Sequence, residues 1–562
     1  MRRRMAALVA PVAALGLLLA ACGGGSGGGN GLQDAGTQSV KSADINPQPL
    51  DKLKDGGNLQ WPIDLMPDNW NYHQVDGTVA DGAYIEGAIL PYVFTQNSDA
   101  SVALNKSYFT SAELISQDPQ VVEYKIDPKA KWSTGRQFSW EDFAAQANAL
   151  NGKNKDYQVS TTSGYEDIAK VEKGTDEQDV KVTFGKKYAE WKGMFAPLYP
   201  KELNSDPGMF NKGWAVKPEI TAGPFKIKSI DQTGKQVVVE RDPAWWGEKP
   251  KLDTVTYKVV ERSALPDAFA NGQIDFYNLN NDINLFKRAQ ADSNAVVRQS
   301  NNPDYTHLTF NGAASSILAD KDLRLAIMKG IDTVTIAKSI LGQMQKDTTP
   351  LGNHLYLKGA KEYADNSGPY KFDANAAKAE LDKLGWKQSG DVRAKDGKPL
   401  KIRMVIPSGT PISQQTGQLL QSQLKTIGAQ LDIQQVPTAE FFKNFVNVGN
   451  FDVTLFRWLS NSFPIDGSKG IYYLDPNNIS QNYGHVGDEK LNKLLDTAAQ
   501  ELDDTKRAAD INAADQEIWA IGHQLPIFQS PGAFATRKTL GNFGSPGYAN
   551  HPYDYLKIGF LK

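Results

Sequence analysis

Short stretches of the chain alternate hydrophobic and polar residues, whereas others repeat hydrophobic residues every three to four positions. Alternation predicts strands at 58–61, 180–185 and 252–260. The stretches 221–231 and 235–242 predict two paired strands, joined by a hairpin turn at Asp231 to Gly234. These segments predict that the first half of the chain contains hairpins.

Helical spacing marks other segments. Ser139 is placed to cap a helix, because Asp142 follows three positions later. Residues 322–342 predict one helix with a single apolar face, made of Leu323, Ile327, Ile331, Val334 and Leu341. A shorter helix is expected between Asp373, as its cap, and Gly385, as its stop. Two more helices are expected at 488–502 and 506–521.

The second half of the chain contains a strand–helix–strand–helix–strand pattern. Its segments are 400–408, 413–427, 429–436, 439–448 and 451–458. This order predicts an α/β fold with a parallel sheet and right-handed crossovers. Ligands of open α/β sheets bind beyond the carboxyl ends of the strands. We therefore expect a ligand site in the segment LSNSFPIDG, with Trp458, Asn461, Phe463 and Asp466 as its candidate residues.

A second candidate loop follows the strand at 58–61. It places Trp70 and Tyr72 among the amide side chains of Asn69 and Gln74. Ligand pockets combine apolar walls with a few polar groups, and both loops have that mixture. The two loops are expected to face each other across a cleft. The alternative, that these aromatic side chains pack beneath surface loops, stays open.

The amino-terminal segment has the organisation of an export signal. Three arginines precede an uncharged apolar run, residues 6–21, which is shorter than the roughly 20 residues of a membrane-spanning helix. Cys22 is the single cysteine, and a glycine-rich stretch follows it, which indicates a flexible tether over 22–52. Leu19-Ala20-Ala21-Cys22 resembles the lipobox of bacterial lipoproteins, which implies a lipid on Cys22 and an anchor at the extracytoplasmic face of the cell membrane. An ordinary signal peptide with a chance cysteine is the alternative.

Charge and composition exclude several classes of protein. The formal net charge is −3, and it becomes −6 when residues 1–21, with their three arginines, are removed. A mildly acidic chain argues against a nucleic-acid partner. The six histidines are isolated, and no HExxH, GxSxG or phosphate-loop motif occurs, so we expect no metal, no cofactor and no enzymatic activity. We interpret Asp503 and Asp504 as a solvated turn between two helices.

Six stretches in order resemble the cluster C (family 5) solute-binding proteins of ABC importers. They include KWSTGRQFSWEDF, TAGPFKIKSID, VVVERDPAWWGEKP, ALPDAFANGQIDFY and LTFNGAASSILADKDLRLAIMKGID. Each stretch is weak evidence alone, but their common order, from about Lys54 to the C-terminus, identifies the chain as a member of that family.

The resemblance implies a two-lobed α/β fold of the periplasmic-binding-protein type II, with an extra subdomain on lobe I. The corresponding boundaries are 53–95, 213–306 and 526–562 for lobe I, 96–212 for the subdomain, and 307–525 for lobe II. The crossovers between lobes are expected near 305–311 and 525–530. The implied function is capture of an oligopeptide, held extended between the lobes, by a monomer that delivers it to transmembrane permease subunits.

One position departs from the family pattern. In many members an aspartate beyond the tryptophan of the third strand binds the free amine of the peptide, and the matching position here is Asn461. A neutral amide supplies no charge for an ammonium group, so the resemblance does not extend to this contact with a free amine. An oligosaccharide-binding protein, a nickel-type binder, a lipid-anchored hydrolase and a signalling surface receptor stay as alternatives.

Overall fold

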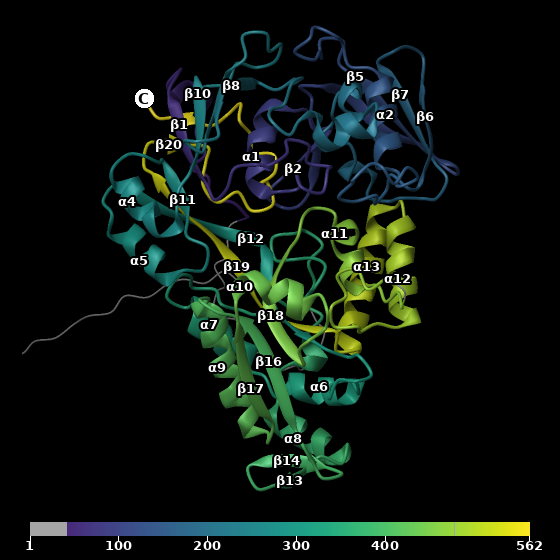
Figure 1. The fold of residues 1–562 in the computed structure, drawn as a ribbon, viewed down its shortest axis with the longest axis vertical. Coiled ribbons are helices and arrows are strands. Elements are labelled where there is room, and N and C mark those ends of the chain that lie inside the picture. The colour runs from purple at the N-terminus through teal and green to yellow at the C-terminus, as the bar shows by residue number, and fades with distance from the viewer. Residues whose placement is uncertain (1–41, 477) are drawn as a thin grey trace, which may run out of the picture. The chain divides into compact units, whose positions relative to one another are not determined.

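A computed structural model describes residues 42–476 and 478–562 (Figure 1). The predicted signal segment, Cys22 and the first part of the expected tether lie outside these residues. Residues 42–52, which were expected to end the tether, contact the C-terminal part of the chain instead. The Asp44 N–H donates to the Ser545 carbonyl at 2.7 Å, and Asn46 Nδ2 donates to the Leu540 carbonyl at 2.8 Å.

The first half of the chain forms two four-stranded sheets. One has the order β1-β10-β9-β8 and the other the order β4-β5-β7-β6. Every second residue of β5 is buried, as a strand with one face on a core requires. Side chains from both sheets join one hydrophobic cluster, which we call the first core and which includes Trp61, Val182 and Tyr257. The strands are β1 (Asn58–Ile63), β4 (Phe109–Gln117), β5 (Gln120–Ile126), β6 (Ile168–Lys173), β7 (Asp179–Phe184), β8 (Phe225–Asp231), β9 (Gln236–Arg241) and β10 (Thr254–Val259).

A six-stranded sheet, of order β11-β19-β12-β18-β16-β17, continues into the second half of the chain. Its strands are β11 (Phe276–Asn278), β12 (Ala295–Phe310), β16 (Lys401–Pro407), β17 (Gln430–Val436), β18 (Val453–Leu459) and β19 (Gln524–Arg537). The long strands β12 and β19 pair antiparallel from Ala295 and Arg537 to Thr309 and Gln524. They run from the region of β11 to that of β18 (Figure 1). The segment 525–530 lies within β19, and the segment 305–311 lies in β12 except for its last residue.

Separate hydrophobic cores surround the rest of this sheet. The second core lies between strands β16–β18 and the helices α6 (Lys321–Lys329), α7 (Thr333–Leu341), α8 (Ala374–Lys383) and α9 (Pro411–Thr426). The third core lies among α11 (Pro464–Tyr472), α12 (Glu489–Gln500) and α13 (Asp504–Ala520). We call the part built on the first core lobe I, and the part built on the second and third cores lobe II.

Smaller elements complete the described residues. The short strands are β2 (Phe94–Gln96), β3 (Val102–Leu104), β13 (Lys387–Ser389), β14 (Val392–Lys395), β15 (Lys398–Pro399), β20 (Leu540–Gly541) and β21 (Gly559–Phe560). The remaining helices are α1 (Ala80–Ile89), α2 (Trp140–Leu150), α3 (Lys201–Asn204), α4 (Leu265–Ala270), α5 (Ile283–Ala291) and α10 (Thr438–Glu440). Single 3-10 or π turns are η1 (Leu50–Lys52), η2 (Trp191–Gly193), η3 (Met209–Gly213), η4 (Arg262–Ala264), η5 (Gly368–Tyr370) and η6 (Phe441–Val446). In residues 42–476 and 478–562, no helix combines the length and the apolar character that crossing a bilayer requires.

Several local predictions are confirmed. Asp142 accepts the Ser139 N–H at 3.0 Å and completes a capping box at the start of α2. The Asp373 carboxylate caps α8, and Gly385 follows that helix with a φ of +86°. The β8–β9 hairpin turns between Asp231 and Gln236. Strand β16 runs parallel to both β17 and β18, as the alternating pattern predicted.

The prediction of one continuous helix over 322–342 is wrong. The segment forms α6 and α7, and Asp332 between them caps α7 by accepting the Thr335 N–H. Val334, expected on the common apolar face, is 56% exposed. The apolar spacing spans the break because both helices pack on the second core, but the aspartate caps and starts a new helix.

Candidate ligand-binding site

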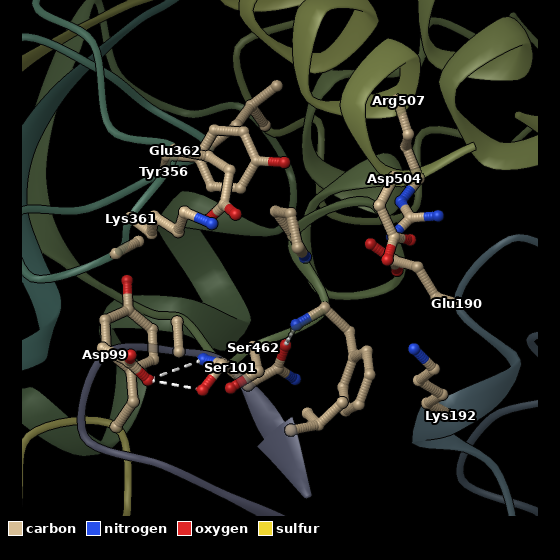
Figure 2. Close-up of a pocket in the computed structure, with 18 of the residues that line it drawn as sticks. Asp99, Ser101, Glu190, Lys192, Tyr356, Lys361, Glu362, Ser462, Asp504 and Arg507 are labelled. Atoms are coloured by element: carbon tan, nitrogen blue, oxygen red, sulfur yellow. Dashed lines mark hydrogen bonds and ion pairs between the residues drawn. The ribbon is translucent and has the colours of Figure 1, made fainter. Parts of the chain in front are cut away.

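A cavity of about 250 Å³ lies where segments of both lobes meet (Figure 2). Lobe I supplies residues 189–192, from the end of the connection after β7 and the start of η2. Lobe II supplies 355–356 and 360–362, the loop 461–464 after β18, and Asp504 and Arg507 of α13. Residues 99–102 and Tyr548 complete the wall. Since the segments come from distant parts of the sequence, only the folded chain creates this cavity.

The walls carry charges of both signs. Asp504 and Arg507, one helical turn apart, form an ion pair at 2.6 Å. Asp99 accepts hydrogen bonds from the Ser101 N–H and hydroxyl, and these bonds hold the pKa of Asp99 below its ordinary value. Within the described residues, four other charged side chains of the wall make no ion pair: Glu190, Lys192, Lys361 and Glu362. Figure 2 shows Lys192 on one side of the cavity and Lys361 with Glu362 on the other.

Glu190 is the most buried charged residue of the wall, with 5% of its surface exposed. Its two carboxylate oxygens accept the N–H groups of Ile465 and Asp466 at 3.0 and 2.6 Å. Burial raises the pKa of Glu190 to about 7, and the negative charge of Asp466 acts in the same direction. A carboxyl group of lobe I therefore contacts the first turn of α11 in lobe II, directly beside the cavity.

The model for the middle part of the bacterial extracellular solute-binding proteins, family 5, matches residues 104–480. The chain belongs to this family. The solute-binding protein is also 40% identical to the oligopeptide-binding protein OppA of Mycobacterium tuberculosis, over 93% of this chain and 88% of that protein.

Solved structures confirm the two-lobed α/β fold. The periplasmic EDTA-binding protein EppA superposes with a TM-score of 0.82 at 23% identity, and the match covers 94% of this solute-binding protein and all of that chain. The oligopeptide-binding protein AppA from Bacillus subtilis, solved with a nonapeptide, gives a TM-score of 0.73 at 20% identity and covers 91% of the chain. At these identities the likeness establishes the fold alone.

The candidate loop after β18 lies partly in the wall of the cavity. Asn461 and Phe463 line it. The Asn461 Oδ1 accepts the Phe463 N–H at 2.7 Å, so that oxygen stabilises the loop. Asp466 does not line the cavity; it is exposed and accepts a hydrogen bond from the Tyr188 hydroxyl at 3.1 Å.

Trp458, the fourth candidate of this segment, lies outside the wall. Its indole ring is stacked between His307 and Tyr483, with centroid distances of 5.6 and 6.0 Å, and its Nε1–H donates to Gln524 Oε1 at 3.2 Å. The ring is only partly buried, and these contacts tie β18 to the crossover strands β12 and β19.

The loop after β1 is packed inside lobe I and does not line the cavity. Trp70 is fully buried, and its Nε1–H donates to the Val216 carbonyl at 3.2 Å. Asn69 donates to the Asn211 carbonyl, and Gln74 Oε1 accepts the Asp76 N–H, so both amides are used within the fold. Tyr72 is half-buried near His551, at a ring distance of 5.9 Å. The structure therefore does not bring the two predicted loops together around the cavity.

Sequence reasoning missed most of the charged wall, namely Glu190, Lys192, Lys361, Glu362 and Arg507. Asp503 does cap α13, as a turn residue would, but the adjacent Asp504 faces the cavity. The spacing of Asp504 and Arg507 places both on one helix face, a signal that could have suggested a paired site. No such signal marks Glu190, because its role depends on a segment of the opposite lobe.

Proposed function

We propose that this solute-binding protein captures oligopeptides for an ABC importer, and that the cavity between the lobes is where the peptide binds. The observation that carries the proposal is the wall of mixed charge supplied by both lobes. A peptide presents an ammonium group, a carboxylate and a row of backbone donors and acceptors. Lys192, Lys361 and Glu362, which form no ion pair within residues 42–476 and 478–562, suit these groups on opposite sides. The 40% identity to a protein named for oligopeptide binding supports the same solute.

Within this proposal, Phe463 supplies apolar contact and the Asn461 Nδ2 group donates to the peptide backbone. The other candidate residues lie outside the wall and support it: Trp458, Asp466, Asn69, Trp70, Tyr72 and Gln74. They position it without touching the ligand. The boundaries expected for the lobes and the subdomain are part of the proposal, since hinge motion between these units would open the cavity.

The proposal includes a lipid on Cys22 that keeps the protein at the extracytoplasmic face of the membrane. One acyl chain binds a membrane marginally, whereas two or more anchor a protein stably. An anchored monomer on a glycine-rich tether could meet the permease subunits repeatedly without diffusing away. The protein acts by binding and release, with no chemical step.

Binding measurements test the peptide assignment. Isothermal titration calorimetry with mixed tripeptides to nonapeptides should give saturable binding, whereas oligosaccharides of similar mass should give none. The double variant Lys361→Ala with Glu362→Gln should weaken peptide binding about tenfold, because it removes two charges from one wall. Lys346→Ala, at an exposed lysine outside the cavity, is the control. Binding of sugars but not peptides, or equal affinities for all variants, would contradict the proposal.

The tryptophans that favoured an oligosaccharide give that alternative little support. Of the 11 tryptophans, Trp191 alone is in the wall of this cavity, and it is 6% exposed. Its ring packs in the first core and against Lys192, whose Nζ lies 5.6 Å from the ring centroid. A sugar would therefore find no open tryptophan face on this wall.

A further inference from the structure

The contact between Glu190 and α11 joins two lobes that have separate cores. The neighbouring Trp191 packs in the first core, whereas Ile465, whose N–H the carboxylate accepts, packs in the third. Helix α11 begins at Pro464, and its N-cap residue, Phe463, has no side chain that could accept a hydrogen bond. The first N–H groups of a helix need an acceptor. Here lobe I provides it across the cleft.

Further contacts between the two lobes lie beside the contact of Glu190 with α11. The Ala189 N–H donates to the Ala499 carbonyl at 2.8 Å, and the Tyr188 hydroxyl donates to Asp466 at 3.1 Å. Gly193 lies so close to Phe463 that an added Cβ would be 3.0 Å from its ring. Gln96 Oε1 accepts both the N–H and the hydroxyl of Ser462, at 3.0 and 2.8 Å. The lobes cannot separate at the cavity without breaking these contacts.

We propose that Glu190 is a latch for the closed form: its carboxyl group holds the lobes together by capping α11, and closing of the cavity is thereby coupled to uptake of a proton. Glu190 is a positioning residue in this scheme, because it shapes the cavity and fixes α11 rather than serving as the main ligand contact. The inference rests on the proposed function, since it assumes that the cavity opens to admit a solute.

The electrostatic environment gives the sign of the coupling. In the closed form, burial and the charge of Asp466 raise the pKa of Glu190 to about 7, although the two N–H groups and Arg507 act in the opposite direction. The other titratable or charged groups that face it are Tyr188 and Lys192 from its own segment, Tyr356 from the opposite wall and Asp504 from α13. In the open form the side chain meets water and has an ordinary pKa near 4.5.

Between these two pKa values, closing takes up a proton. Closure is therefore most favourable below about pH 4.5 and weakens as the pH rises towards 7. The affinity for peptide should fall about tenfold between pH 5.5 and pH 7, a window in which a peptide amine stays largely protonated.

Three variants test the latch. Glu190→Gln keeps the length and one carbonyl acceptor but cannot titrate, so its affinity should be independent of pH in this window and similar to that of the parent at pH 5.5. Glu190→Ala removes the cap, and its affinity should fall at least tenfold at pH 5.5. Glu113→Gln, at an exposed glutamate of β4 that forms no ion pair among the described residues, is the matched control and should behave as the parent.

A second readout does not depend on the ligand. Small-angle X-ray scattering of the unliganded full chain should give a larger radius of gyration for Glu190→Ala than for the parent, with circular dichroism confirming that both are folded. If no peptide binds to any variant but the radii differ as expected, the peptide assignment fails and the latch stands. Equal radii, or equal pH dependence of affinity in the parent and Glu190→Gln, would overturn the latch.

Discussion

The loops that follow β1 and β18 have the same kind of composition but opposite roles in the fold. Each combines large aromatic residues with asparagine or glutamine. In the loop after β1, the amides of Asn69 and Gln74 bond to the fold itself and Trp70 is fully buried. In the loop after β18, Asn461 and Phe463 are half-buried and reach a cavity. Composition predicts a structured loop, whereas the partners of its polar groups decide whether it can serve a ligand.

The largest effect should come from truncating the buried aromatic residue of the first loop. Trp70→Ala removes a fully buried indole and leaves the Val216 carbonyl without its donor, so it should lower the free energy of unfolding by about 3–5 kcal/mol. Phe463→Ala should cost only about 1 kcal/mol of stability but weaken peptide binding about tenfold. Chemical denaturation and calorimetry measure the two quantities. If Phe463→Ala also lost several kcal/mol of stability with no change in affinity, the contrast between the loops would disappear.

The tight packing of the loop after β1 should also make the free energy of unfolding depend on pH. His73, in the loop after β1, is buried, with 7% of its surface exposed, and its Nε2–H donates to the Pro197 carbonyl at 2.9 Å. Burial lowers the pKa of His73 to about 4, below the value of about 6.5 in the unfolded chain. The unfolded state therefore binds more protons than the folded state below pH 6.5. The contribution of His73 to the free energy of unfolding, about 3 kcal/mol in total, is lost as the pH falls from 6.5 to 4.

Comparison of the parent with His73→Gln isolates this contribution. Between pH 6 and pH 5, the free energy of unfolding of the parent should fall more steeply, by about 1 kcal/mol per pH unit. Burial also lowers the pKa of His551 to about 4 and of His523 to about 3, whereas Glu190 acts in the opposite sense. These groups are common to both proteins, so the difference between the slopes is the test. Parallel curves would show that His73 is accessible to water and that the loop is less tightly packed.

Local signals in the sequence were sufficient for many elements of the fold. The cap at Ser139 and Asp142, the hairpin at Asp231 and the parallel strands β16 to β18 depend on neighbouring residues or on a short repeating pattern. The break between α6 and α7 was missed because apolar spacing continued across it, although Asp332 was a visible capping residue. The order of motifs, rather than any single one, identified the family.

The site was less predictable than the fold. Asn461 and Phe463 were found because ligands collect beyond the carboxyl ends of strands. Glu190 was not found, since its contacts with lobe II arise only when residues 276 positions apart meet, as in the bond from the Asp466 N–H to Glu190. Lys192 was not found because only the folded chain places it in the wall of the cavity. Trp70 and Phe463 could not be told apart, because burial depends on the surrounding fold and not on the loop itself.

The smallest expected effect is a change in affinity for the free amine of the peptide. It tests whether the loop after β18 contacts that amine. Asn461→Asp keeps an oxygen that can accept the Phe463 N–H, so the loop should keep its conformation, and it adds a negative charge to the cavity wall. The affinity for a peptide with a free amine, relative to its N-acetylated form, should rise up to about fivefold, as expected for a partly exposed ion pair worth about 1 kcal/mol or less.

Calorimetry with both peptides and both proteins at pH 6.5 measures this ratio, and 0.5 M salt should reduce the gain because it screens exposed charges. A ratio that is the same in parent and variant would show that the amine lies elsewhere. The most suitable carboxylate would then be Glu362, which lies on the wall without an ion pair among the described residues. The loop after β18 would in that case contribute shape through Phe463 and backbone contact through Asn461, but no recognition of charge. Its distinction from the loop after β1 would rest on access to the ligand alone.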